Sequence, residues 1–181
     1  RQYFLAFFIF IGLSAHAQIF SWRDPKNSTC YKIDFVTNRC YVSNSKGLWQ
    51  DTGNVNLQDI KPADLFSNAD AINPVKIPSK TGTYLIMECS GQVYYFEPAT
   101  RTLKREDLTF YRGANCQAVQ FNRNGTFYSF GGYGFWQSTN IMTQYNAVSK
   151  DWTHILVQGK IPNSIHKKSS AYLPDLDKFI V

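Results

Sequence analysis

The sequence predicts an all-β protein built from a repeated antiparallel unit. Aromatic residues make up 16% of the chain and only two methionines are present, a bias that favours strands. Short runs of alternating apolar and polar residues are separated by turns rich in Gly, Asn and Pro. Two sequence motifs also recur about 50 positions apart, as expected for repeated supersecondary units. A length of 181 residues suits one domain or two small ones.

Residues 1–17 have the form of a signal peptide. The uncharged apolar run Tyr3–Leu13 is followed by Ala15 and Ala17, which fit the small-residue rule for cleavage. The run is shorter than the roughly 20 apolar residues that cross a bilayer as a helix. We therefore expect an exported protein (periplasmic, cell-surface or secreted) whose mature part is 18–181.

The first two strands are expected over 30–36 and 39–43, as a hairpin flanked by Cys30 and Cys40, which could face each other across it. With Cys89 and Cys116 they make four cysteines, which allow three pairings into two disulfides or remain buried thiols. No C-x-x-C pair is present, so a zinc site is not expected.

Residues 57–78 are expected to form an insertion loop before the next strands. Pro62 suits the first position of a single helical turn over 62–64. Pro74 and Pro78 impose extended backbone on the residues that precede them.

The next strands are expected over 83–89, 92–97 and 102–106, and they contain the second copy of the first motif. Its three copies begin at Tyr31, Tyr94 and Thr143, and Phe96 and Tyr145 are 49 positions apart. Each copy has a polar residue at the turn and a hydroxyl residue three positions later, both able to bond turn amides. The motif predicts a strand, a tight turn and a return strand.

The second motif predicts strands over 116–121 and 126–131, joined by an Asn-Gly turn, and its second copy predicts strands over 169–173 and 177–181. Strands over 140–147 and 151–157 lie between the two copies. The last strand stops without a turn or cap, so we expect the chain to be the N-terminal piece of a longer protein.

A series of residues at fixed spacing resembles a kelch repeat. The series consists of the pair Gly131-Gly132, followed by Tyr145, Trp152, Gly159, Pro162 and His166. The resemblance is good over 116–181, degenerate over 83–115 and faint over 18–56. An Arg that often follows the Pro in this family is replaced here by Ile165-His166-Lys167.

The resemblance implies a partial β-propeller of four-stranded antiparallel kelch-type blades. Propellers close with four to eight blades, so two to three blades leave the ring open. It also implies structural roles for four residues. Gly131 and Gly132 would allow close approach of neighbouring blades, while Tyr145 and Trp152 would fill the space between them.

The sequence favours an exported binding module, or the outer part of a membrane receptor or sensor, over an enzyme. It lacks the nucleophile elbow, the phosphate-binding loop and the HExxH helix. No cofactor or metal site is expected, and the net charge of +6 forms no basic run that would indicate nucleic acid. A membrane is expected only through export or an anchor beyond Val181. Because some kelch-like propellers are oxidases or mutarotases, the alternative is a carbohydrate-acting enzyme with most active residues beyond the C-terminus.

The loop over 133–140 is the predicted ligand-binding site, for a protein or a glycan. It carries several aromatic and amide side chains and no charge. The residues assigned to binding are Tyr133, Phe135, Trp136, Gln137 and Asn140. The competing interpretation is that Phe135 or Trp136 packs into the neighbouring sheet.

Overall fold

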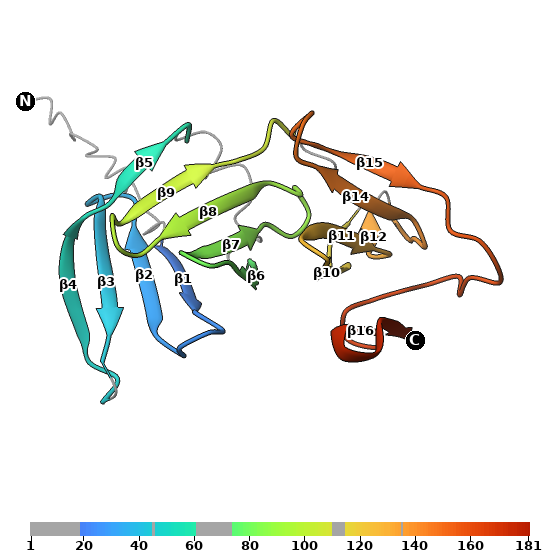
Figure 1. Ribbon diagram of the computed structural model, residues 1–181, viewed down its shortest axis with the longest axis horizontal. Coiled ribbons are helices and arrows are strands. Elements are labelled where there is room, and N and C mark those ends of the chain that lie inside the picture. The colour runs from blue at the N-terminus through green and yellow to red at the C-terminus, as the bar shows by residue number, and fades with distance from the viewer. Residues whose placement is uncertain (1–18, 45, 61–73, 110–114, 135) are drawn as a thin grey trace, which may run out of the picture.

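The computed structural model describes residues 19–44, 46–60, 74–109, 115–134 and 136–181. These residues form an all-β molecule in which the described helical structure is the single 3₁₀ turn η1 (Pro174–Leu176). Three main sheets stand side by side along an open arc (Figure 1). The prediction of an all-β fold with four-stranded antiparallel sheets is therefore confirmed.

The first sheet is a four-stranded antiparallel meander. Its strands are β1 (Ile19–Arg23), β2 (Cys30–Asp34), β3 (Arg39–Ser43) and β4 (Trp49–Asn54), in that spatial order. Alternate side chains of β1 and β2 are buried, so one face of the sheet belongs to the core.

The second sheet has four antiparallel strands and one parallel addition. The antiparallel strands are β6 (Val75–Pro78), β7 (Thr83–Ile86), β8 (Val93–Glu97) and β9 (Thr102–Arg105). The short β5 (Asn56–Gln58) pairs in parallel with β9. Only one residue separates β4 from β5, so the chain passes directly from the outer edge of the first sheet to that of the second (Figure 1).

The third sheet repeats the antiparallel arrangement with β10 (Val119–Arg123), β11 (Thr126–Phe130), β14 (Met142–Asn146) and β15 (Asp151–Ile155).

Two smaller hairpins complete the described structure. The strands β12 (Tyr133–Gly134) and β13 (Gln137–Ser138) form one between β11 and β14, and β16 (Ala171–Leu173) pairs with β17 (Lys178–Ile180) beside the third sheet.

Each of the eleven predicted strands overlaps an observed strand, but β1, β4, β5, β6, β12 and β13 were not predicted. The predicted insertion 57–78 is bounded by strands, because β5 and β6 occupy its ends. Pro78 is compatible with β6 because this strand lies at a sheet edge. The predicted signal peptide and the helical turn over 62–64 lie outside the described residues.

The three copies of the first motif form three equivalent hairpins, β2–β3, β8–β9 and β14–β15. Each has a four-residue turn, and its last turn residue has a positive φ (Asn38, Arg101 and Lys150). In each hairpin one pair of opposed residues, seven positions apart in sequence, is buried; the pairs are Ile33 with Cys40, Phe96 with Leu103, and Tyr145 with Trp152.

The turn role predicted for the polar residue is confirmed in two of these hairpins, whereas the hydroxyl residue takes part there through its backbone N–H. Asp34 Oδ1 accepts hydrogen bonds from the backbone N–H groups of Val36 and Thr37, at 2.9 and 3.2 Å. Asn146 Oδ1 accepts the corresponding bonds in the third hairpin. In the second hairpin the longer Glu97 accepts a bond from the hydroxyl of Thr100 instead.

The core consists of three apolar layers between successive sheets. The first layer packs β1–β3 against the second sheet, with Trp22, Tyr31 and Phe96 in mutual ring contact. The second layer joins the second and third sheets, and the third joins the third sheet to the β16–β17 hairpin. The edge strand β10 of the third sheet contacts both β6, at an edge of the second sheet, and β16, along the concave side of the arc (Figure 1).

The proposed facing of Cys30 and Cys40 is wrong. In the β2–β3 register, Cys30 lies opposite Ser43 and Cys40 lies opposite Ile33. Both remain free thiols, and the disulfide is Cys89–Cys116. The four-residue turn sets this register, which displaces the two cysteines by three positions along the hairpin.

Candidate binding face

Loops from the second and third sheets meet where these two sheets adjoin, and together they are here called the loop face. It consists of residues 87–92 between β7 and β8, 115–118 before β10, 131–140 around β12–β13, and 165–167. Side-chain and backbone bonds described below connect these four segments, which lie up to 80 positions apart. The loop face contains the binding loop predicted from sequence.

The Cys89–Cys116 disulfide links the two sheets at the loop face. Cys116 also exchanges two backbone hydrogen bonds with Tyr133, at 3.1 and 2.7 Å. One half of the disulfide, Cys116, is thus bonded directly to Tyr133, the first residue of the predicted binding loop. Such a link restricts the unfolded chain and holds the loop segments in register.

Gly131 and Gly132 let the loops approach closely. Their φ angles are +75° and +100°, a region that disfavours residues with a side chain. A Cβ atom on Gly131 would lie 2.3 Å from the carbonyl oxygen of Ile165, and one on Gly132 would lie 2.9 Å from that of Cys116. Gly132 N–H donates a 2.7 Å hydrogen bond to the same Ile165 oxygen. These glycines therefore fix the β12–β13 hairpin against residues 165–167.

Trp136 occupies the tip of this hairpin and its side chain is 93% exposed. The hairpin pairs Tyr133 with Ser138 and Gly134 with Gln137, so its loop contains only residues 135 and 136. Trp136 has a φ of +66°, at the turn. Trp136 therefore does not pack into the neighbouring sheet, whereas Phe135, the other ring of the competing interpretation, lies outside the described residues.

The other predicted site residues surround Trp136 at different depths. Tyr133 is 42% exposed, Gln137 is exposed and Asn140 is half-buried. Phe135 lies outside the described residues. The loop thus presents one fully exposed ring, one partly exposed ring and amide groups to solvent.

Two polar pairs brace the loop face, and sequence reasoning did not identify either. Ser138 Oγ lies 3.0 Å from His166 Nε2, which ties the hairpin to residues 165–167. Lys167 Nζ forms an ion pair with Glu88, which lies in the β7–β8 loop of the second sheet. The partners are 28 and 79 positions apart, so no local pattern indicated them.

Burial lowers the pKa of Lys76 on β6. Glu88 opposes this effect and Lys167 adds to it, so the three charges influence one another. The loop face itself carries one charge of each sign, on Glu88 and Lys167, and Lys167 directly follows the His166 that contacts the hairpin.

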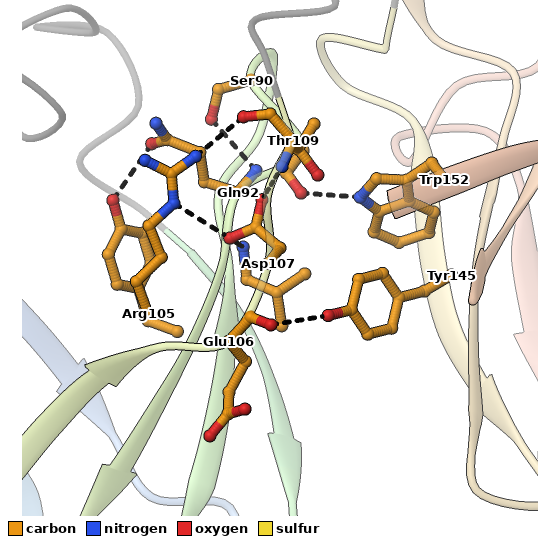
Figure 2. Close-up of polar contacts among 11 residues, drawn as sticks. Ser90, Gln92, Arg105, Glu106, Asp107, Thr109, Tyr145 and Trp152 are labelled. Atoms are coloured by element: carbon orange, nitrogen blue, oxygen red, sulfur yellow. Dashed lines mark hydrogen bonds and ion pairs between the residues drawn. The ribbon is translucent and has the colours of Figure 1, made fainter. Parts of the chain in front are cut away.

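Beneath the loop face, two side chains of the third sheet bond to the second (Figure 2). Trp152 Nε1 donates to the Gly91 carbonyl oxygen at 2.7 Å, and the Tyr145 hydroxyl donates to that of Glu106 at 3.0 Å. Burial, followed by the nearby Asp107 and Glu106, raises the pKa of Tyr145, which keeps its hydroxyl a donor. The two rings thus join adjacent sheets by packing and by hydrogen bonds.

A buried carboxylate organises the second-sheet side of this contact (Figure 2). Asp107 accepts hydrogen bonds from the backbone N–H groups of Val93 (2.9 Å) and Thr109 (3.0 Å), and it pairs with Arg105 at 3.2 Å. Its side chain is fully buried. Because both oxygens are satisfied, this carboxylate holds structure rather than presenting a reactive group.

The described residues contain no group of three His, Cys, Asp or Glu side chains that could hold a metal ion. Across those same segments, no helix is long and apolar enough to cross a membrane. In comparisons with known proteins, no family model matches the chain, and no curated protein matches it either.

Proposed function

We propose that this chain is part of an exported kelch-type propeller that acts as a binding module and recognises a protein or a glycan through the loop face. The observation that carries the proposal is Trp136, whose indole is held 93% exposed at the tip of a braced hairpin. Tryptophan is enriched among the residues that carry most of the binding energy of interfaces, so an exposed indole on a hairpin fixed by neighbouring loops suits recognition.

The propeller part of the proposal is supported by repetition in the fold. The three equivalent hairpins place buried residue pairs at the same position of each motif. Successive sheets also share apolar layers, and the edge strands β6 and β10 of the second and third sheets are in contact. Stacked sheets that share apolar layers with their neighbours are the building principle of propellers.

The export part rests on the predicted signal peptide and is compatible with the Cys89–Cys116 disulfide. Disulfides persist mainly in oxidising compartments.

The chemistry of the hairpin suits recognition rather than catalysis. Tryptophan offers a large rigid surface that loses little conformational entropy on binding. Gln137 and Ser138 add polar groups beside it, and the loop carries no charge. Such a surface can stack on a sugar ring or insert into a pocket of a protein.

The test uses a printed glycan array and a displayed peptide library, each probed with the wild-type chain and with Trp136→Ala. We expect specific binders whose affinity falls at least about 30-fold, or 2 kcal/mol, in Trp136→Ala. Trp49→Ala is the matched control, because Trp49 is also exposed (45%) but lies on β4, in the first sheet. Binders that survive Trp136→Ala unchanged would contradict the proposal.

A further inference from the structure

A cleft of about 560 Å³ lies between the second and third sheets, separate from the loop face. Its walls come from the ends of β6 and β9, the start of β7, and the hairpins β10–β11 and β14–β15. No residue of the loop face lines it. This volume falls within the range of sites that take small ligands.

Aromatic rings form a rigid floor for the cleft. The half-buried Tyr84 has its ring centre 4.8 Å from Phe127, in edge-to-face geometry. Phe127 in turn stacks on Tyr145 at 6.0 Å, and both belong to the core between the sheets. Burial raises the pKa of Tyr84, so its hydroxyl stays protonated near neutral pH. The floor therefore combines an apolar surface with a phenol.

Amide side chains line the walls above this floor. Asn122 and Asn146 use their Oδ1 atoms to accept turn N–H groups, from Gly125 and Val148, each at 2.9 Å. These bonds leave the two Nδ2 groups as donors, without acceptors among the described residues. Gln144 lies on β14 and also lines the cleft. Its side-chain amide likewise has no hydrogen-bond partner in the described parts of the chain.

The charges at the cleft do not favour a strongly charged ligand. The carboxylate of Glu106 is paired with Lys104 at 3.2 Å, and Lys150 is the cation that lines the opposite wall. Amides both donate and accept, which suits the paired hydroxyls of a sugar, and aromatic rings suit its apolar face. We propose that the cleft binds a neutral oligosaccharide, at a site distinct from the loop face.

The test is saturation-transfer NMR on the full chain with four neutral probes, the tetrasaccharides of glucose, xylose, mannose and galactose. We expect transfer to at least one of them, and calorimetry then gives its affinity. Gln144→Ala should weaken that affinity about tenfold, the value of one hydrogen bond near 1.4 kcal/mol. Asn122→Asp, which preserves side-chain shape and the turn bond from Gly125 but removes the Nδ2 donor, should also weaken it and guards against a fold defect in the first variant.

Gln50→Ala is the matched control, because it removes the same amide from an exposed position on β4, in the first sheet, and it should leave saccharide affinity unchanged. Gln137→Ala tests the loop face as the alternative site. No transfer to any of the four probes, or unchanged affinity in both cleft variants, overturns the proposal. Weakening by Gln137→Ala alone would place the saccharide on the loop face, which overturns the cleft site while supporting the function proposed above.

Discussion

The indole of Trp152 donates a 2.7 Å hydrogen bond to the carbonyl oxygen of Gly91, which lies 61 positions earlier, in the loop that joins β7 and β8 of the neighbouring sheet. Trp152 is 3% exposed and packs on Tyr145 at 5.6 Å. Gly91 has a φ of +72°, and a Cβ atom there would lie 3.2 Å from the indole nitrogen. Packing and hydrogen bonding at this pair thus depend on the same backbone conformation.

Removing this ring should destabilise the whole stack. We expect Trp152→Ala to lower the free energy of unfolding by about 3–5 kcal/mol, because it opens a cavity between two sheets. Trp152→Phe keeps much of the packing but leaves the Gly91 oxygen unpaired, so it should cost about 1–3 kcal/mol. Urea unfolding measures both values. A loss below about 1 kcal/mol for Trp152→Ala would show that the ring does not hold the sheets together.

The disulfide should leave two titratable thiols out of four cysteines. Under denaturing, non-reducing conditions, Ellman's reagent should report Cys30 and Cys40 only. In the native protein Cys40 should react slowly, because it is buried and burial raises the pKa of its thiol. Four reactive thiols in the denatured, oxidised protein would contradict the Cys89–Cys116 bond.

Gly131 should be intolerant of a side chain for a reason beyond its φ angle. Gly131→Ala would place Cβ 2.3 Å from a backbone oxygen, whereas a Cβ atom on Gly159, which has a φ of +97°, would meet nothing within 4 Å. Both substitutions incur the strain of positive φ, so their difference measures the clash. We expect Gly131→Ala to unfold at a lower urea concentration than Gly159→Ala; equal midpoints would contradict the close approach.

The β16–β17 turn should contribute acid-sensitive stability. Arg123, and then the hydroxyl of Tyr172, hold the pKa of Asp177 below its usual range. The folded pKa is lower than the unfolded one, so the contribution is present above about pH 4 and is lost as pH falls through the folded value. Asp177→Asn should therefore show a smaller loss of stability between pH 7 and pH 3 than wild type, by urea unfolding. Asparagine tolerates the left-handed φ of 49° at this position.

The sequence predicted features that depend on neighbours along the chain. The three equivalent hairpins follow from local turn residues, so the turn roles of Asp34 and Asn146 could be predicted from the residue pattern alone. Strands such as β4 and β5 could not be predicted, because WQDTGN and NLQ show no alternation. The strand β4 forms against the neighbouring β3, and β5 forms only where the edge of the distant β9 accepts it.

The candidate site was predicted only in part, because some of its features depend on neighbours along the chain and others on contacts between distant segments. The exposed Trp136 lies in a loop whose composition was visible in the sequence, and a two-residue hairpin loop explains its exposure. The pairs Ser138–His166 and Glu88–Lys167, and the choice of Cys89 and Cys116 among three cysteine pairings, depend on how the sheets stack. No local signal specifies that stacking.

The most direct test of the account is to measure stability and binding together on Trp136→Ala. The binder is the glycan or peptide selected with the wild-type chain on the array or library. Because the indole touches solvent on nearly all sides, the account predicts an unfolding free energy within about 0.5 kcal/mol of wild type. It predicts at the same time an affinity lower by about 2 kcal/mol or more. Lower stability with normal affinity in the folded fraction would contradict it and exclude this hairpin as the binding site.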